Sequence, residues 1–264
     1  MSDESTHRFP YHYIPAFLTV ALLIVWILRW LNPPPGVPAM PTVFRIARFS
    51  NLLPCFLGFF LLPSLTRDLR ILLALVTAGV LSEVATWIAI DYVITNQRSQ
   101  NLLWMFHIFT IAEFIFLMMI FNIWHAGRRS RRAVSIAGPV VLVILIAAKL
   151  YQGLKGTEQF DSFATTIEGL VVVTLAVLTL IYLTSDDIVH IFEDPRFWVV
   201  SAIMFYFAGN LIIFALGQEA LGVLRADETT DTIWTMHSAL NITANFLYAY
   251  SFYLSHKKMR AAAA

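Results

Sequence analysis

Six residues that could carry out acid–base or ligand-binding chemistry lie inside apolar runs of the sequence. An ionisable group in hydrocarbon costs several kcal/mol, so it is rarely placed there without a partner or a task. Carboxylates and imidazoles can transfer protons, bind a metal or form hydrogen bonds with a ligand. These residue types predict a buried polar pocket and leave its task open. They are Glu83, His107, Glu168, Asn210, His237 and Asn241.

The runs around these residues are long enough to cross a membrane. The chain has 264 residues, of which 58% are hydrophobic and 13% are charged, whereas about a quarter of a soluble domain is charged. A helix needs about 20 predominantly apolar residues to cross the hydrocarbon core. We therefore expect an all-α polytopic membrane bundle of eight transmembrane helices. The segments that predict them are 12–31, 45–65, 70–92, 101–123, 133–151, 162–184, 197–218 and 232–255.

The spans form a single transmembrane domain with an addition at each end. We expect an extra helix and Pro-rich loop at 1–40, a seven-helix core at 41–256 and a tail at 257–264. The first apolar run is too long for the centre of a signal peptide, so we expect it to be retained. Asp194 and Pro195 are typical of a helix start and predict the beginning of the seventh span. The single cysteine, Cys55, excludes an internal disulfide.

Lys and Arg residues are shared unequally between the two ends of the predicted bundle. Eleven of the 18 lie on the side that holds both termini, and the arginines at 128–132 dominate this bias. Basic loops are typical of the cytoplasmic side. We therefore expect a multi-pass protein of the bacterial inner membrane with both termini in the cytoplasm. The net charge of +1 does not indicate nucleic-acid binding.

Helix geometry places the six polar residues at similar depths. At 1.5 Å per residue, they lie roughly 8 to 14 Å below the outer surface. Because successive helices run in opposite directions, randomly placed residues would not converge in this way. The residues expected to border the pocket are Glu113, roughly 18 Å deep, with Tyr206, Trp234 and Asn51.

Several kinds of chemistry fit such a pocket. No metal or cofactor is predicted, because the spans contain no His-x-x-x-His or Glu-x-x-His pair; zinc, iron or haem at His107 and His237 is kept as an alternative. A proton or ion path would need polar groups in the inner half, and they stop near Glu113.

Two further alternatives remain. In a lipid-modifying enzyme, His107 or His237 would act as acid or base, and Glu83 or Glu168 would orient it. In a structural or assembly protein, the polar residues would only join helices.

Several short patterns occur together along the chain. They are W-x-x-H-x-x-x-x-x-E-F at 104–114, T-x-E at 166–168, D-P-x-F-W at 194–198, Y-F-x-G-N at 206–210 and W-x-x-H-x-x-x-N at 234–241. The set resembles a family of uncharacterised seven-helix bacterial membrane proteins, with the first helix of this chain as an addition. Gly169 stands where serine is common in that family.

Members of that family resemble sensor or signalling modules that are often coded near histidine kinases. The motif positions carried over to this chain are His107, Glu113, Glu168, Asn210, His237 and Asn241. From the residues and the resemblance we expect a sensor that binds a small molecule or lipid headgroup in an outward-facing pocket. The resemblance implies a signalling kinase or another membrane protein as its partner. Whether the protein is also an enzyme is left open.

Overall fold

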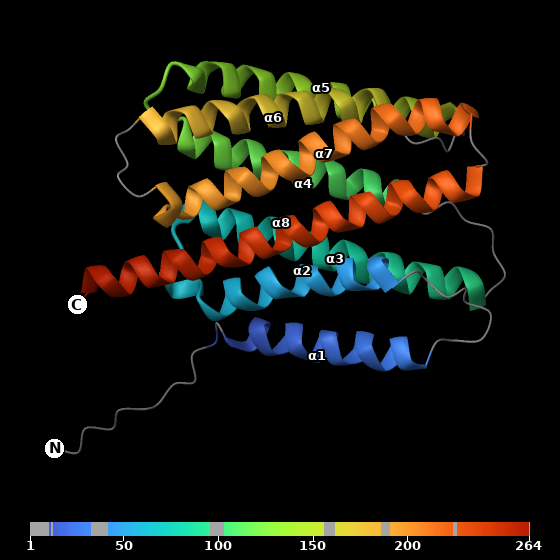
Figure 1. Ribbon diagram of the computed structural model, residues 1–264, viewed down its shortest axis with the longest axis horizontal. Helices are drawn as coiled ribbons and strands as arrows, with labels where there is room; N and C mark the ends of the chain where they lie inside the picture. The colour runs from blue at the N-terminus through green and yellow to red at the C-terminus, as the bar shows by residue number, and fades with distance from the viewer. Residues whose placement is uncertain are drawn as a thin grey trace.

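The structure is a computed structural model that describes residues 11, 13–32, 42–95, 103–155, 162–185, 191–223 and 226–263. Within these residues it contains eight α-helices, two short 3-10 helices and no β-strand. The α-helices lie side by side along one common direction (Figure 1). The predicted all-α bundle is therefore confirmed.

Each α-helix overlaps one of the predicted spans. The 3-10 helices η1 (Leu62–Ser64) and η2 (Ile191–Glu193) precede the third and seventh α-helices. The last helix continues through 257–263, where the sequence predicts a tail. The helices are α1 (Tyr13–Leu31), α2 (Thr42–Phe60), α3 (Arg67–Thr95), α4 (Leu103–Trp124), α5 (Ser130–Lys155), α6 (Ser162–Ser185), α7 (Pro195–Val223) and α8 (Ala226–Ala263).

Seven of the described helices, α1 to α7, are long and apolar enough to cross a membrane. Helix α8 falls outside this set because His237, Asn241 and Asn245 interrupt its apolar residues. It nevertheless runs the length of the bundle and packs along α2 and α7 (Figure 1). Polar side chains are tolerated at membrane depth when they face other helices rather than lipid. The eighth predicted span therefore depends on this packing rather than on hydropathy alone.

Helices α2 to α8 follow one another around a closed ring. Contacts join α2 to α3, α3 to α4, α4 to α5 and α6, α6 to α7, α7 to α8, and α8 back to α2. Helix α1 packs on α2 at the outside of this ring (Figure 1). The ring creates an interior that side chains from several helices can reach.

One end of the bundle carries the connections α2–α3, α4–α5 and α6–α7 and the last turns of α8, and we call it the basic end. The turn between α4 and α5 includes Gly127 at φ 81°, a conformation that costs glycine little. Asp194 caps α7 as predicted, since its Oδ1 accepts a 2.8 Å hydrogen bond from the backbone N–H of Arg196. Pro195 occupies the first helical position, also as predicted.

A network of amides and a hydroxyl joins α2 to α8 inside the ring. The buried Nδ2 of Asn245 lies within hydrogen-bond distance of Oγ of Ser50, Oδ1 of Asn51 and Oδ1 of Asn241. Lipid offers no replacement for these acceptors. Asn245 is therefore a polar contact between two helices that are neighbours in space and distant in the chain.

Replacing Asn245 with Ala should lower the stability of the detergent-solubilised protein. Interhelical hydrogen bonds in membranes contribute about 0.6 kcal/mol on average, and the loss of several shared contacts should add to this. Thermal unfolding followed by tryptophan fluorescence would measure the change. Thr243→Ala is the matched control, because the exposed Thr243 hydroxyl donates only to the Ala239 carbonyl of its own helix. Equal melting temperatures for both variants would contradict the role given to Asn245.

Candidate functional site

Glu168 on α6 belongs to a buried polar cluster inside the ring. Its side chain is 1% exposed, and its Oε1 has no hydrogen-bond partner. Glu113 on α4 and Lys149 on α5 interact with it electrostatically. A buried acceptor without a partner carries a desolvation penalty of about 1–3 kcal/mol. A hydrogen-bond donor on a ligand would offset that penalty.

Helices α7 and α8 supply a second group of polar side chains to this cluster. Nδ1 of His237 lies 2.9 Å from Oδ1 of Asn210. Because an amide oxygen can only accept, Nδ1 donates, and Nε2 becomes the acceptor nitrogen of the neutral ring. The ring of Tyr206 lies 5.7 Å from that of His237, and its hydroxyl is hydrogen-bonded to Asn210. The imidazole is thus held in a defined orientation.

Electrostatic interactions connect the two groups. Both Glu113 and Glu168 act on Tyr206, and Glu113 also acts on Tyr248 of α8. The sequence predicts Glu113 and Tyr206 at the border of the pocket, and both interact with Glu168. Four helices therefore contribute to one cluster, which consists of Glu113, Glu168, Tyr206, Asn210 and His237.

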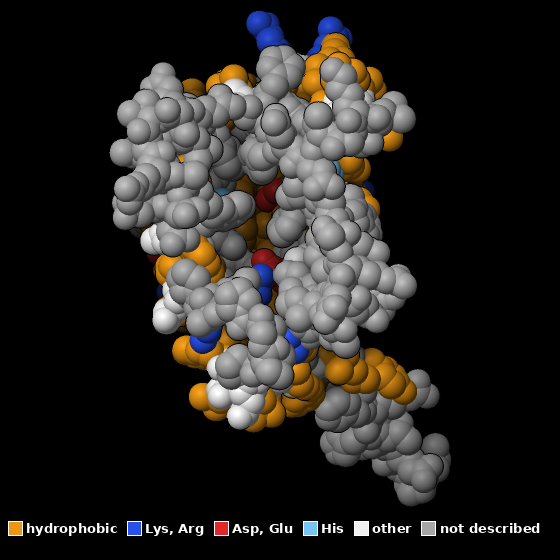
Figure 2. Space-filling view, turned by 90° about the vertical axis from the view of Figure 1, so that its right-hand side faces the viewer, with side chains coloured by type: hydrophobic (Ala, Val, Ile, Leu, Met, Phe, Trp, Pro, Cys, Tyr) orange, Lys and Arg blue, Asp and Glu red, His pale blue; other side chains and the backbone are white. Residues whose placement is uncertain are grey.

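The end of the bundle opposite the basic end is hollowed between the helices (Figure 2). Acidic side chains are visible inside this hollow, with a histidine side chain near one of them and a basic side chain beside another. This is the end toward which the sequence predicts that the pocket opens.

Several predicted site residues have partners of their own. Oε2 of Glu83 lies 3.1 Å from Nε of Arg48, so this pair joins α3 to α2. Asn241 and Asn51 take part in the Asn245 network at the α2–α8 contact. These interactions connect neighbouring helices. Of the six residues predicted for the pocket, the candidate site around Glu168 therefore includes Glu168, Asn210 and His237.

Two other predicted residues lie on helices that form the ring. His107 is half-buried on α4. Trp234 belongs to α8, but its side chain lies outside the described residues. Gly169, next to Glu168, faces Leu211 of α7, since a Cβ atom at Gly169 would lie 2.9 Å from Cδ2 of that leucine. A serine at this position would require Leu211 to shift.

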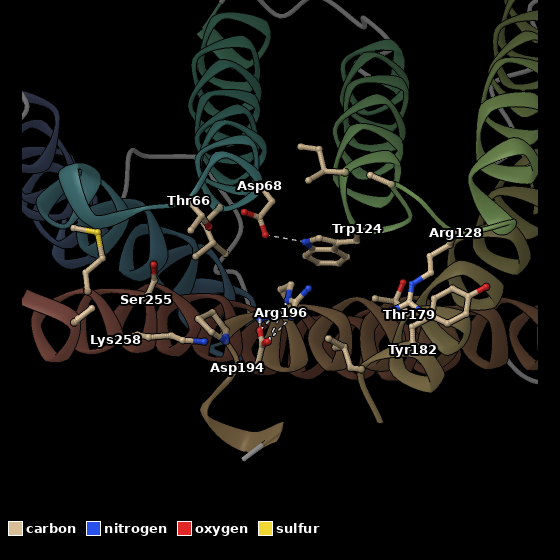
Figure 3. Close-up of a pocket in the computed structure, with 17 residues that line it drawn as sticks. Thr66, Asp68, Trp124, Arg128, Thr179, Tyr182, Asp194, Arg196, Ser255 and Lys258 are labelled. Carbon is tan, nitrogen blue, oxygen red and sulfur yellow. Dashed lines mark hydrogen bonds and ion pairs between the residues drawn. The ribbon is translucent and has the colours of Figure 1, made fainter. Parts of the chain in front are cut away.

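A second pocket, which the sequence analysis does not predict, lies at the basic end (Figure 3). Its volume is about 650 Å³, and α3, α4, α6, α7 and α8 all contribute to its wall. The sequence patterns identify Asp194 and Arg196 only as parts of a helix start. The convergence of five helix ends depends on the closed ring, which no local pattern reports. The charged and aromatic wall residues include Asp68, Trp124, Arg128, Tyr182, Asp194, Arg196 and Lys258.

His125 lies just beyond α4, next to this second pocket. Its buried ring is hydrogen-bonded through Nδ1 to Ser130 (2.7 Å) and through Nε2 to Thr179 (2.9 Å). Because the Thr179 hydroxyl donates to the Leu175 carbonyl, Nε2 carries the proton of the neutral ring and Nδ1 accepts from Ser130. Burial and the nearby charge of Arg128 lower the pKa of His125 below its ordinary value of 6.5.

The lowered pKa of His125 predicts acid sensitivity at the basic end. Below pH 6.5 the unfolded chain binds a proton at His125, whereas the folded protein binds it only at lower pH. The free energy of unfolding therefore decreases as the pH is lowered below 6.5. His125→Gln should be less stable at pH 7.5, and its melting temperature should fall less between pH 7.5 and 5.5. Differential scanning fluorimetry at matched ionic strength would measure the slope of melting temperature against pH for the wild-type protein and for the variant. Identical slopes would show that His125 does not contribute to the pH dependence.

Metal-ligand residues do not gather in the part of the chain that the structure describes. There, no group of three or more His, Cys, Asp or Glu side chains is placed to hold a metal ion. No family model, curated protein or solved structure matches the chain. The residues of the two sites are therefore the evidence for function.

Proposed function

We propose that this chain is a membrane-embedded sensor that binds a small molecule or lipid headgroup in the cluster around Glu168. The observation that carries the proposal is Oε1 of Glu168, which is buried without a hydrogen-bond partner inside the ring. Such an acceptor is costly unless it has a task. A ligand that supplies a donor would restore the missing hydrogen bond.

The chemistry of the cluster favours a ligand that carries hydrogen-bond donors. Carboxyl groups come from Glu113 and Glu168, and the neutral imidazole of His237 adds an acceptor nitrogen. Amine and hydroxyl groups match these acceptors. Ethanolamine and glycerol, either free or as lipid headgroups, are therefore suitable first probes.

Binding in this cluster would bias the packing of the helices that form it. Its residues come from α4, α6, α7 and α8, and these helices continue to the basic end (Figure 1). A ligand changes a conformational equilibrium only through unequal affinity for the two states. Unequal affinity is expected here because a shift of α6 against α7 would move Glu168 relative to Asn210, which holds the His237 ring.

The proposed setting is the bacterial inner membrane, with the hollow facing outward and both termini in the cytoplasm. The bias of Lys and Arg toward the basic end supports this orientation. The resemblance to seven-helix signalling proteins supports a partner on that side, such as a histidine kinase. The binding event and its readout would then lie at opposite ends of the same helices.

Glu168→Gln should weaken binding of ethanolamine or glycerol about tenfold, because the carboxyl group that accepts a hydrogen bond from the ligand is replaced by an amide. Thermal shifts of the purified protein with each probe, and mass spectrometry of co-purified lipids, would measure the loss. His237→Ala should weaken binding in the same assays, and Thr174→Ala on the exposed face of α6 is the control.

Wild-type affinity in both Glu168→Gln and His237→Ala would overturn the proposal. Turnover of a bound lipid that His237→Ala abolishes would instead favour the lipid-modifying enzyme. In that case the hydrogen bond from Nδ1 of His237 to Asn210 would orient the general base.

The proposed orientation predicts which positions an impermeant maleimide reaches in spheroplasts. In a Cys55→Ser background, Asn32→Cys should be labelled in intact spheroplasts, because this exposed residue follows α1 at the end opposite the basic end. Arg129→Cys, exposed in the α4–α5 turn, should be labelled only after lysis. The reverse pattern would place the hollow on the cytoplasmic side.

A further inference from the structure

The pocket at the basic end is separate from the cluster around Glu168 and has a different chemistry. It lies where α3 and α7 begin and where α4, α6 and α8 end (Figure 3). Its volume of about 650 Å³ lies within the usual range of small-molecule sites. One part of its wall is apolar, from Leu69, Ile123, Leu183 and Met259, and the rest is charged or polar.

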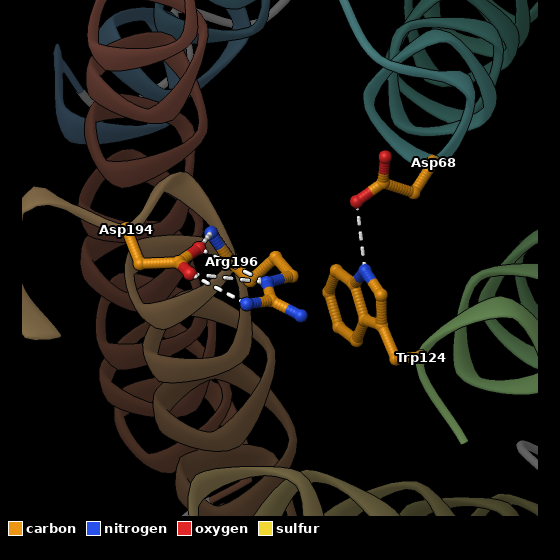
Figure 4. Close-up of polar contacts among 4 residues, drawn as sticks. All are labelled: Asp68, Trp124, Asp194 and Arg196. Carbon is orange, nitrogen blue, oxygen red and sulfur yellow. Dashed lines mark hydrogen bonds and ion pairs between the residues drawn. The ribbon is translucent and has the colours of Figure 1, made fainter. Parts of the chain in front are cut away.

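Both carboxylates in the wall are engaged by neighbouring side chains. Asp194 holds Arg196 through two nitrogens, with Nη2 2.7 Å from Oδ2 and Nε 3.1 Å from Oδ1. Asp68 accepts a 2.7 Å hydrogen bond from Nε1 of Trp124 (Figure 4). Burial raises the pKa of Asp194, but its hydrogen bonds with Arg196 and the charge of Lys258 outweigh burial and lower the pKa below the ordinary value. This acid is therefore ionised at neutral pH.

Three basic side chains line the pocket against these two acids. Arg196 reaches from Asp194 toward Trp124 across the pocket (Figure 4). Arg128 is positioned over the ring of Tyr182, 5.0 Å from its centroid. Lys258 comes from α8 on the side of Asp194 (Figure 3). The basic side chains outnumber the acids, so the wall keeps a positive charge.

The surroundings strengthen this positive field. Exposed basic residues that directly adjoin wall residues in the chain include Arg129, Lys257 and Arg260, and they outnumber the exposed acid Glu193 beside Asp194. Clusters of this kind at the end of membrane helices attract anionic headgroups and other anions. Arginine suits phosphate in particular, because its planar fork can donate two parallel hydrogen bonds to one phosphate group.

We propose that the basic-end pocket binds a phosphate group, with Arg128, Arg196 and Lys258 as its cationic wall. The phosphate can belong to an anionic phospholipid or to a soluble ion. The apolar part of the wall and the position at the ends of membrane-spanning helices match a phospholipid, whose glycerol and first acyl carbons would lie against Leu69 and Ile123. The proposal does not depend on the ligand of the Glu168 cluster.

Native mass spectrometry of the purified full-length protein tests the proposal. Palmitoyl-oleoyl phosphatidylglycerol is titrated into the micelles, with phosphatidylcholine as the net-neutral comparison. Lys258→Gln should weaken the first phosphatidylglycerol adduct about tenfold, because its ammonium group lines the pocket and would donate a charge-assisted hydrogen bond to the phosphate. Lys257→Gln is the matched control, because Lys257 is its exposed neighbour outside the pocket wall. It should change binding less than twofold.

Two further variants separate binding from folding. Arg196→Lys keeps a positive charge beside Asp194 but offers three hydrogen-bond donors where arginine offers five, so fewer donors remain for a phosphate and binding should weaken while the protein remains folded. Asp68→Asn removes a negative charge from the wall and should strengthen binding. A purely structural role of these residues would not produce a tighter complex.

A second arm uses inorganic phosphate and thermal shifts. Stabilisation by millimolar phosphate with the same pattern of variants would assign the site to a soluble ion, and adducts with phosphatidylglycerol alone would assign it to a headgroup. Equal losses in Lys257→Gln and Lys258→Gln would indicate diffuse attraction to the whole basic end and overturn the proposal. Failure of both probes with the wild-type protein would also overturn it.

Discussion

The bundle depends on one constraint, namely that hydrocarbon supplies no hydrogen-bond partner for a polar side chain. Within the ring, partners come from other helices: Arg48 pairs with Glu83, Asn245 bonds to α2, and Asn210 bonds to His237. Each of these pairs fixes the rotation of two helices about their axes. The alignment that results leaves Oε1 of Glu168 without a partner in the interior, so the same constraint that orders the bundle also defines the candidate site.

Hydropathy predicted the helices well because a span is a property of a local run of residues. The ends of the helices are harder to predict. Lys257, Lys258 and Arg260 are compatible with both a helix and a polar tail, and the structure shows that α8 continues through them to Ala263. Depth arithmetic also selected Glu168, Asn210 and His237, which the structure brings into one cluster. Depth gives only a height along the axis, however, so it does not show that Glu113 on α4 interacts with Glu168 on α6.

Other parts of the site required knowledge of which helices are neighbours. The sequence gives no sign that Arg48, counted only for orientation, faces Glu83. The basic-end pocket has no local sequence signal for the same reason, since Asp68 and Trp124 are 56 residues apart and meet only when the ring closes. Pairings of this kind are set by tertiary packing, which no local pattern of charge or hydropathy reports.

The low hydropathy of α8 has a consequence for how the protein is made. A helix that carries His237, Asn241 and Asn245 would partition poorly into lipid by itself. Its partners α2 and α7 precede it in the chain, so both have been synthesised when α8 leaves the ribosome. Membrane insertion of the last helix is therefore coupled to assembly, and a chain truncated before α8 would leave the acceptors on Ser50 and Asn51 facing lipid.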